Sequence, residues 1–178
     1  MGVALGFGMV AGAAATQWSH VVGSAPMLAA VLCAAPFLRK RDLILMSLVA
    51  MLTRDVIGGV SWFTLVRLAA ILSVVGVLWI LRVRPSVKSF VIGLGASSVV
   101  YHVVLTMGDW VTQTCSKAPL TWRGLQEVVV SNAPYAGRSI LTDAVFAGAF
   151  LTLYLMVGLL MASRWPSLLP LPSPSTNR

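Results

Sequence analysis

The chain has 178 residues, of which 58% are hydrophobic and only 10% are charged. Soluble domains average about 25% charged residues, so a soluble fold of this length would have to leave much apolar surface in water. The net charge of +8 would suit a nucleic-acid-binding protein, but the basic residues stand in short clusters between apolar runs, as in membrane-protein loops. We therefore exclude nucleic acid as a partner and predict an all-α integral membrane protein in contact with the lipid bilayer.

Apolar runs recur along the whole chain, and about 17–25 mostly apolar residues are enough to cross a bilayer as a helix. We predict one transmembrane domain, residues 1–163, followed by a Pro- and Ser-rich cytoplasmic tail, residues 164–178, that is disordered. The six predicted spans lie near residues 2–18, 22–38, 43–59, 63–81, 89–107 and 139–162.

The second span is the shortest, because its apolar run covers only residues 25–38. It crosses the membrane if residues 21–24 extend it or if the bilayer thins locally. A re-entrant segment is the alternative. Pro26 fits the first turn of a helix that starts near Ser24 or Ala25, where its missing N–H costs nothing.

Loop charge predicts the orientation. With six spans both termini lie on one side, and membrane proteins concentrate Lys and Arg in their cytoplasmic loops. The side that holds the termini collects Arg39, Lys40, Arg41, Arg82, Arg84, Lys88, Arg164 and Arg178. The opposite side, called the outer side here, holds only Lys117, Arg123 and Arg138 in its long loop. We therefore expect both termini to be cytoplasmic, in the inner membrane of a bacterium.

Ionisable side chains inside or beside the spans gather toward the outer side, together with tryptophans of the outer connections. They are Arg54, Asp55, Arg67, His102, Asp109, Arg138 and Asp143, with Trp18 and Trp62. In one interpretation the arginines and aspartates tie the helices together as ion pairs, and the tryptophans form an interfacial belt. In the other they line an outward-facing pocket for a small polar or anionic solute. We favour the pocket, because ionisable residues inside membranes usually mark functional sites.

Two further segments have a helical pattern. Ala4, Gly8 and Gly12 recur every four residues in the first span, with Ala11 and Ala15 beside them, and such a smooth face lets another helix approach closely. It serves either packing within the bundle or docking of a partner membrane protein. Residues 120–132 place Trp122, Leu125 and Val128 at helical spacing, which predicts an amphipathic helix at the outer interface.

Catalytic and metal-binding motifs are not found. The chain has no HExxH, GxSxG or P-loop sequence, and Cys33 and Cys115 are far apart with no CxxC partner. We therefore predict no enzymatic activity, no cofactor and no metal site. A membrane enzyme stays open as a third function class, although the chain offers few carboxylates to build its site.

Three stretches support a family resemblance: Ser24–Met27, Met51–Asp55 and Ala133–Asp143. They resemble a group of small, largely uncharacterised bacterial membrane proteins that is itself similar to the S components of energy-coupling-factor vitamin transporters. In that group an Asn-Phe-Thr-Pro-like turn opens helix 2, a Ser-Asp-like pair ends helix 3 and a Leu-Gly-Asp-like segment opens the last helix. Here Ser24-Ala25-Pro26, Arg54-Asp55 and Thr142-Asp143 stand at those places.

The resemblance implies a bundle of six membrane helices that binds a small solute from the outer side. It also implies a transmembrane coupling protein and ATPases as partners, with the small-residue stripe of Ala4, Gly8 and Gly12 facing the coupling protein. Arg54, Asp55 and Asp143 carry over as candidate solute-binding residues. We therefore expect a solute-binding transport subunit. The alternative is a non-catalytic accessory or structural subunit packed against a larger membrane complex.

Overall fold

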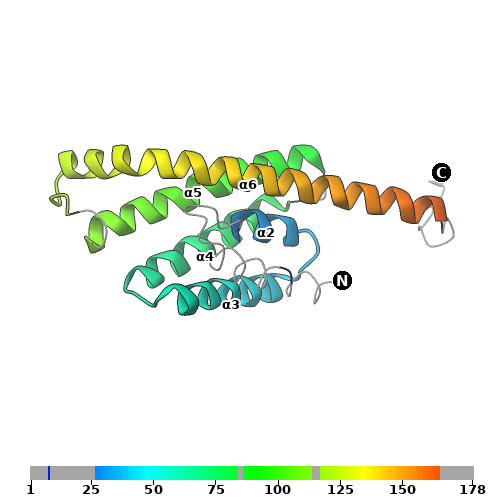
Figure 1. Ribbon diagram of the computed structural model, residues 1–178, viewed down its shortest axis with the longest axis horizontal. Coiled ribbons are helices and arrows are strands. Elements are labelled where there is room, and N and C mark those ends of the chain that lie inside the picture. The colour runs from blue at the N-terminus through cyan, green and yellow to red at the C-terminus, as the bar shows by residue number, and fades with distance from the viewer. Residues whose placement is uncertain (1–7, 9–26, 84–85, 114–116, 165–178) are drawn as a thin grey trace, which may run out of the picture.

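The structure is a computed structural model that describes residue 8 and residues 27–83, 86–113 and 117–164. Within these ranges the chain forms five helices and no strand (Figure 1). They are α2 (Met27–Ala34), α3 (Lys40–Gly58), α4 (Phe63–Leu81), α5 (Val87–Thr112) and α6 (Trp122–Arg164). The all-α class predicted from composition is therefore confirmed for the described part of the chain.

Three of these helices are long and apolar enough to cross a membrane: Phe63–Leu81, Val87–Thr112 and the stretch Trp122–Leu153 of α6. Large apolar side chains such as Leu65, Ile80 and Val99 are 59–73% exposed. An apolar exterior would be costly in water, but it matches a hydrocarbon solvent. Both observations indicate a membrane protein, while the total of six spans stays a prediction.

Several predicted features lie outside the described residues. They are the first span near residues 2–18, Ala4, Ala11, Gly12 and Ala15 of the small-residue stripe, Trp18, and the tail beyond residue 164. Gly8 is the described member of the stripe, and it is exposed.

The short helix α2 lies at the centre of the described bundle. Seven of its eight residues are buried, and it packs against α3, α4, α5 and α6 (Figure 1). Val31 and Leu32 are fully buried there, beside Met51 of α3 and Val74 of α4 in the same apolar cluster. Contact on all sides explains why this stretch is apolar throughout, with no polar face. The part of the predicted second span that precedes α2, residues 22–26, is not described.

Each helix end has a local cause. α3 ends at Gly59, whose φ of 99° suits a residue without a Cβ atom. α5 begins after Ser86, whose hydroxyl accepts a hydrogen bond from the Ser89 N–H at 3.3 Å. At its other end Gln113 adopts φ 55°, and its side-chain amide donates to the Trp110 carbonyl at 3.1 Å. These residues fix where α3 ends and where α5 begins and ends.

The connections gather at two ends of the bundle. Figure 1 shows the α2–α3 and α4–α5 connections and the C-terminal end of α6 toward the right, and the α3–α4 and α5–α6 connections toward the left. The basic residues Arg39, Lys40, Arg41, Arg82 and Lys88 therefore share one end of the described chain. The predicted orientation requires these residues to lie on one side of the membrane.

The predicted break between residues 120–132 and a last span at 139–162 is not what the structure has. One continuous helix of 43 residues, α6, covers both segments and contains Pro134. A proline removes one intrahelical hydrogen bond, and packing against α2 and α5 offsets that loss here. Because α6 does not break, polar residues before and after Pro134 lie on one face.

Candidate solute pocket

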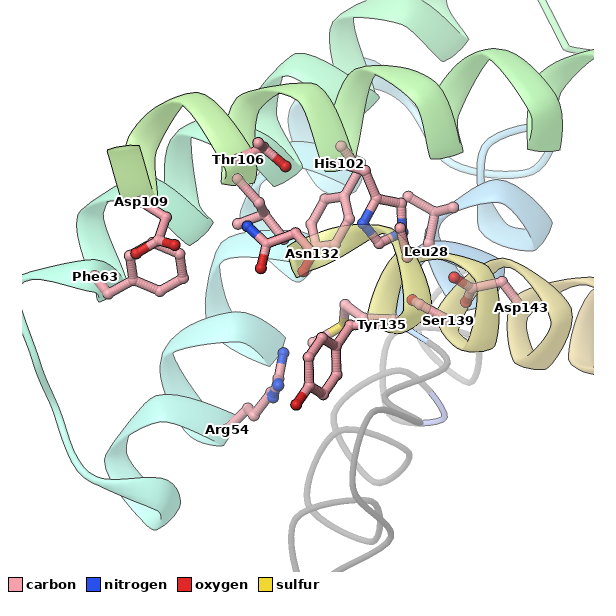
Figure 2. Close-up of a pocket in the computed structure, with 14 residues that line it drawn as sticks. Leu28, Arg54, Phe63, His102, Thr106, Asp109, Asn132, Tyr135, Ser139 and Asp143 are labelled. Atoms are coloured by element: carbon pink, nitrogen blue, oxygen red, sulfur yellow. The ribbon is translucent and has the colours of Figure 1, made fainter. Parts of the chain in front are cut away.

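A cavity of about 230 Å³ lies among α2, α3, α4, α5 and α6 (Figure 2). Its apolar lining comes from Met27, Leu28, Phe63, Leu105 and Ala136. Its polar lining comes from Arg54, Tyr101, His102, Thr106, Asp109, Asn132, Tyr135, Ser139 and Asp143. Since polar groups are expensive inside a membrane, so many around one cavity need a specific reason.

Helical spacing explains how α5 and α6 supply most of this lining. His102, Thr106 and Asp109 recur at intervals of three and four residues on α5. On α6, Asn132, Ser139 and Asp143 share a face in the same way. Residues at these intervals lie one above another on a helix, so each helix presents a polar row to the cavity.

Arg54 of α3 is the cation that lines the cavity among the described residues. Its guanidinium lies near the hydroxyl of Tyr101 on α5. It forms no ion pair within the described part of the chain. Figure 2 shows the Arg54 side chain extending beside the ring of Tyr135. A half-buried guanidinium with no charged partner among the described residues has N–H donors for an acceptor in the cavity.

Asp143 of α6 lines the cavity from the other side, and its side chain is only 2% exposed. Its Oδ1 atom accepts a hydrogen bond from the backbone N–H of Ala29 at 3.2 Å. That contact ties α6 to the central helix α2. No lysine or arginine among the described residues forms an ion pair with this carboxylate. A buried carboxylate without a cationic partner is a costly arrangement that ligand binding would relieve.

His102 of α5 also presents a polar atom that a ligand would satisfy. Its ring lies edge-on to Tyr101, with centroids 5.5 Å apart and planes at 81°. Its Nε2 atom is buried and has no hydrogen-bond partner among the described residues. Most buried polar atoms in folded proteins do have a partner. An orphaned ring nitrogen on the cavity wall is therefore a candidate contact for a solute.

Asp55 and Arg67 form an ion pair beside the cavity and do not line it. Arg67 Nη1 donates to Asp55 Oδ1 at 2.8 Å, joining α4 to α3. The Arg67 guanidinium carbon also lies 5.2 Å from the ring centre of Phe63, which does line the cavity. The pair therefore supports the cavity wall, as in the structural interpretation of these charges.

The structure thus divides the residues predicted for the site. It brings Arg54, His102, Asp109 and Asp143 together around one cavity. Asp55 and Arg67 stand next to it as a pair. Arg138 is exposed on α6, and Trp62 is 82% exposed between α3 and α4, so neither reaches the cavity. Trp18 is not described.

The sequence interpretation missed five polar residues of the lining: Tyr101, Thr106, Asn132, Tyr135 and Ser139. A signal for some of them was present. Asn132 and Ser139 stand eleven and four residues before Asp143, which is helical spacing if the helix is continuous. The predicted break near residues 132–139 hid this pattern. Tyr101 carried no signal beyond its place beside His102.

Within the described ranges, no group of three or more His, Cys, Asp or Glu side chains is placed to hold a metal ion. The fold and the cavity together define a helical membrane protein with a polar pocket between its helices. The chain belongs to a family of unknown function (DUF6580), which matches residues 2–168. The sequence matches no curated protein and no solved structure.

Proposed function

We propose that this protein is the solute-binding subunit of a membrane transporter, similar in architecture to the S components of energy-coupling-factor transporters. The observation that carries the proposal is the cavity of about 230 Å³, lined by nine polar side chains within a membrane protein. Binding pockets in proteins typically measure about 300–1,000 Å³, so this one suits a small solute.

The state of the polar groups supports binding over a purely structural role. In a purely structural role each charged side chain would form an ion pair, and side chains would fill the space between the pairs. Asp55 and Arg67 meet that description. Arg54 and Asp143 do not, because both line an open cavity and neither has a charged partner among the described residues. Such groups are available to a ligand.

The proposal also includes the topology and the partners expected from the sequence. In it, residues 2–18 and 22–38 complete six spans, and both termini and the basic connections lie in the cytoplasm of a bacterium. The small-residue stripe of Ala4, Gly8, Ala11, Gly12 and Ala15 faces a transmembrane coupling protein that works with ATPases. This arrangement puts the solute pocket toward the outer side and the docking face within the membrane.

The test is solute binding by the purified full-length protein in detergent, screened against vitamins, nucleobases and amino acids. A bound solute raises the unfolding free energy by about 2.7 kcal/mol at a hundred times its Kd, so thermal unfolding detects it. We expect at least one solute to stabilise the protein. Arg54→Ala should then lower the affinity about tenfold or more, as loss of a charge-assisted hydrogen bond does.

Arg138→Ala is the matched control, since it removes an exposed arginine that does not line the cavity. Its affinity should equal that of the unsubstituted protein. Binding of no solute, together with an Arg54→Ala protein that is changed only in stability, would reject the proposal. It would favour the accessory subunit of a larger membrane complex.

A further inference from the structure

Arg54 and Asp143 line the cavity without a charged partner among the described residues, and they differ in sign and come from different helices. Arg54 comes from α3 and Asp143 from α6. Figure 2 shows Tyr135 and Ser139 between them. They do not form an ion pair with each other, since the Asp143 contact is with the Ala29 N–H. A binding site that holds a cation and a carboxylate apart is complementary to a ligand with both charges.

The remaining charges near the cavity do not change this balance. Arg67, which the sequence suggested as an attractor of anions, is neutralised by Asp55 at 2.8 Å. Arg138 is exposed and outside the lining. Asp109 is buried, lines the cavity and is already engaged in an interaction of its own. Among the residues that the structure describes, Arg54 is therefore the cation available to a solute, and a solute with only a negative charge would leave the Asp143 carboxylate without a cationic partner.

Building on the proposed transport function, we infer that the solute is a small zwitterion of the amino-acid type. Its ammonium group pairs with the Asp143 carboxylate, and its carboxylate pairs with the Arg54 guanidinium. Both contacts are charge-assisted, and the burial of Asp143 makes its contact stronger than the same contact on a surface. The rest of the solute lies against Tyr101, Tyr135 and Leu28, and His102 Nε2 accepts a hydrogen bond from it.

The cavity size agrees with this class. A volume of about 230 Å³ accommodates a single small metabolite and is too small for a dinucleotide. The aromatic lining gives apolar contact area beside the two charges. The solute therefore combines a compact body with one positive and one negative group, as amino acids and betaines do.

The probes are the twenty standard L-amino acids and glycine betaine, tested by thermal unfolding and equilibrium binding on the purified full-length protein. Each amino acid that binds is tested again as its decarboxylated amine and as its deaminated acid. For phenylalanine these are phenethylamine and 3-phenylpropanoate. We expect each single-charge analogue to bind at least tenfold more weakly than the amino acid, because one ionic contact is lost.

Two variants assign the charges. Asp143→Asn keeps a side-chain oxygen that can accept from the Ala29 N–H, so folding is retained while the negative charge is lost. It should weaken amino-acid and amine binding about tenfold and leave the acid unaffected. Arg54→Gln should weaken the amino acid and the acid and leave the amine unaffected. Glu127→Gln and Arg138→Gln, at exposed positions of α6, are the matched controls and should change no affinity.

The outcomes separate this inference from the transport proposal beneath it. If a deaminated acid binds as tightly as its amino acid, or if Asp143→Asn weakens the acid and the amine equally, the zwitterion is wrong. The same holds if only a vitamin or nucleobase without an ammonium group binds, and in that case the transport proposal survives. If no solute of any class binds, both are wrong.

Discussion

Asp55 and Asp143 are both 2% exposed, but their carboxylates face different surroundings. Asp55 is paired with Arg67 across the α3–α4 contact, and its second oxygen, Oδ2, is buried without a hydrogen-bond partner among the described residues. Asp143 has a backbone N–H and an open cavity. Removing the arginine from a buried pair leaves a carboxylate with neither water nor a counter-charge, which costs more than the pair itself contributes.

This difference predicts an unusual stability pattern for the pair. Arg67→Gln should lower the free energy of unfolding by roughly 3 kcal/mol, toward the low end for a buried pair because Arg67 is 28% exposed. The double variant Asp55→Asn with Arg67→Gln should be more stable than Arg67→Gln alone, since no charge is then left unpaired. Chemical unfolding in detergent measures both. Arg138→Gln, an exposed control, should change little, and equal stabilities for all three variants would contradict the argument.

At the scale of the elements, apolar runs predicted the positions of helices well, whereas polar residues predicted the ends of helices poorly. The range 63–81 predicted from hydropathy coincides with α4, because this helix contains one charge and ends just before Arg82. The predicted span 89–107 is contained in α5, which continues through Asp109 to Thr112. Hydropathy cannot detect that Asp109 is buried, because an aspartate lowers the local hydropathy in the same way whether it lies in a helix or in a loop.

The charged residues of the candidate site were predictable from the sequence, but their pairing and the uncharged residues of the site were not. Arg54, His102, Asp109 and Asp143 stand out in sequence because charge is rare in apolar helices. Which of the charges pair with each other depends on how α3 and α4 are juxtaposed, and that is a property of packing. The uncharged polar residues Asn132 and Ser139 belong to the site because α6 continues through Pro134, which the local sequence argued against.

The α4–α5 contact depends on a glycine. A Cβ atom added at Gly108 would overlap the side chain of Val66, which is β-branched and cannot move aside easily. Gly108→Ala should therefore destabilise the protein by about 1–3 kcal/mol, as overpacking does. Gly95→Ala on the same helix is the control, because no atom lies within 4 Å of its added Cβ. It should be neutral or slightly stabilising, since alanine favours helix. Equal unfolding temperatures for the two variants would show that α4 and α5 are not so closely packed.

At the scale of the whole molecule, the bundle has a polar cavity and a basic end. The exposed Lys40 ammonium lies 3.8 Å from the ring centre of Trp79, a cation–π contact between the start of α3 and the last turns of α4. Trp79 is 57% exposed, which suits the level of the lipid headgroups. Basic residues and tryptophan thus share the end that the positive-inside rule assigns to the cytoplasm.

This polarity predicts an orientation that is testable in cells. Ser61 and Ser86 are exposed residues in the α3–α4 and α4–α5 connections, which α4 separates. In a background with Cys33→Ala and Cys115→Ala, Ser61→Cys should react with a membrane-impermeant maleimide on intact spheroplasts. Ser86→Cys should react only after the membrane is opened, because the basic connections Arg39–Arg41 and Arg82–Lys88 are retained on the cytoplasmic side. Labelling of both before lysis would mean that α4 does not span the membrane. The reverse pattern would mean that the pocket is loaded from the cytoplasm, and the outward-facing transport subunit would then be the wrong function.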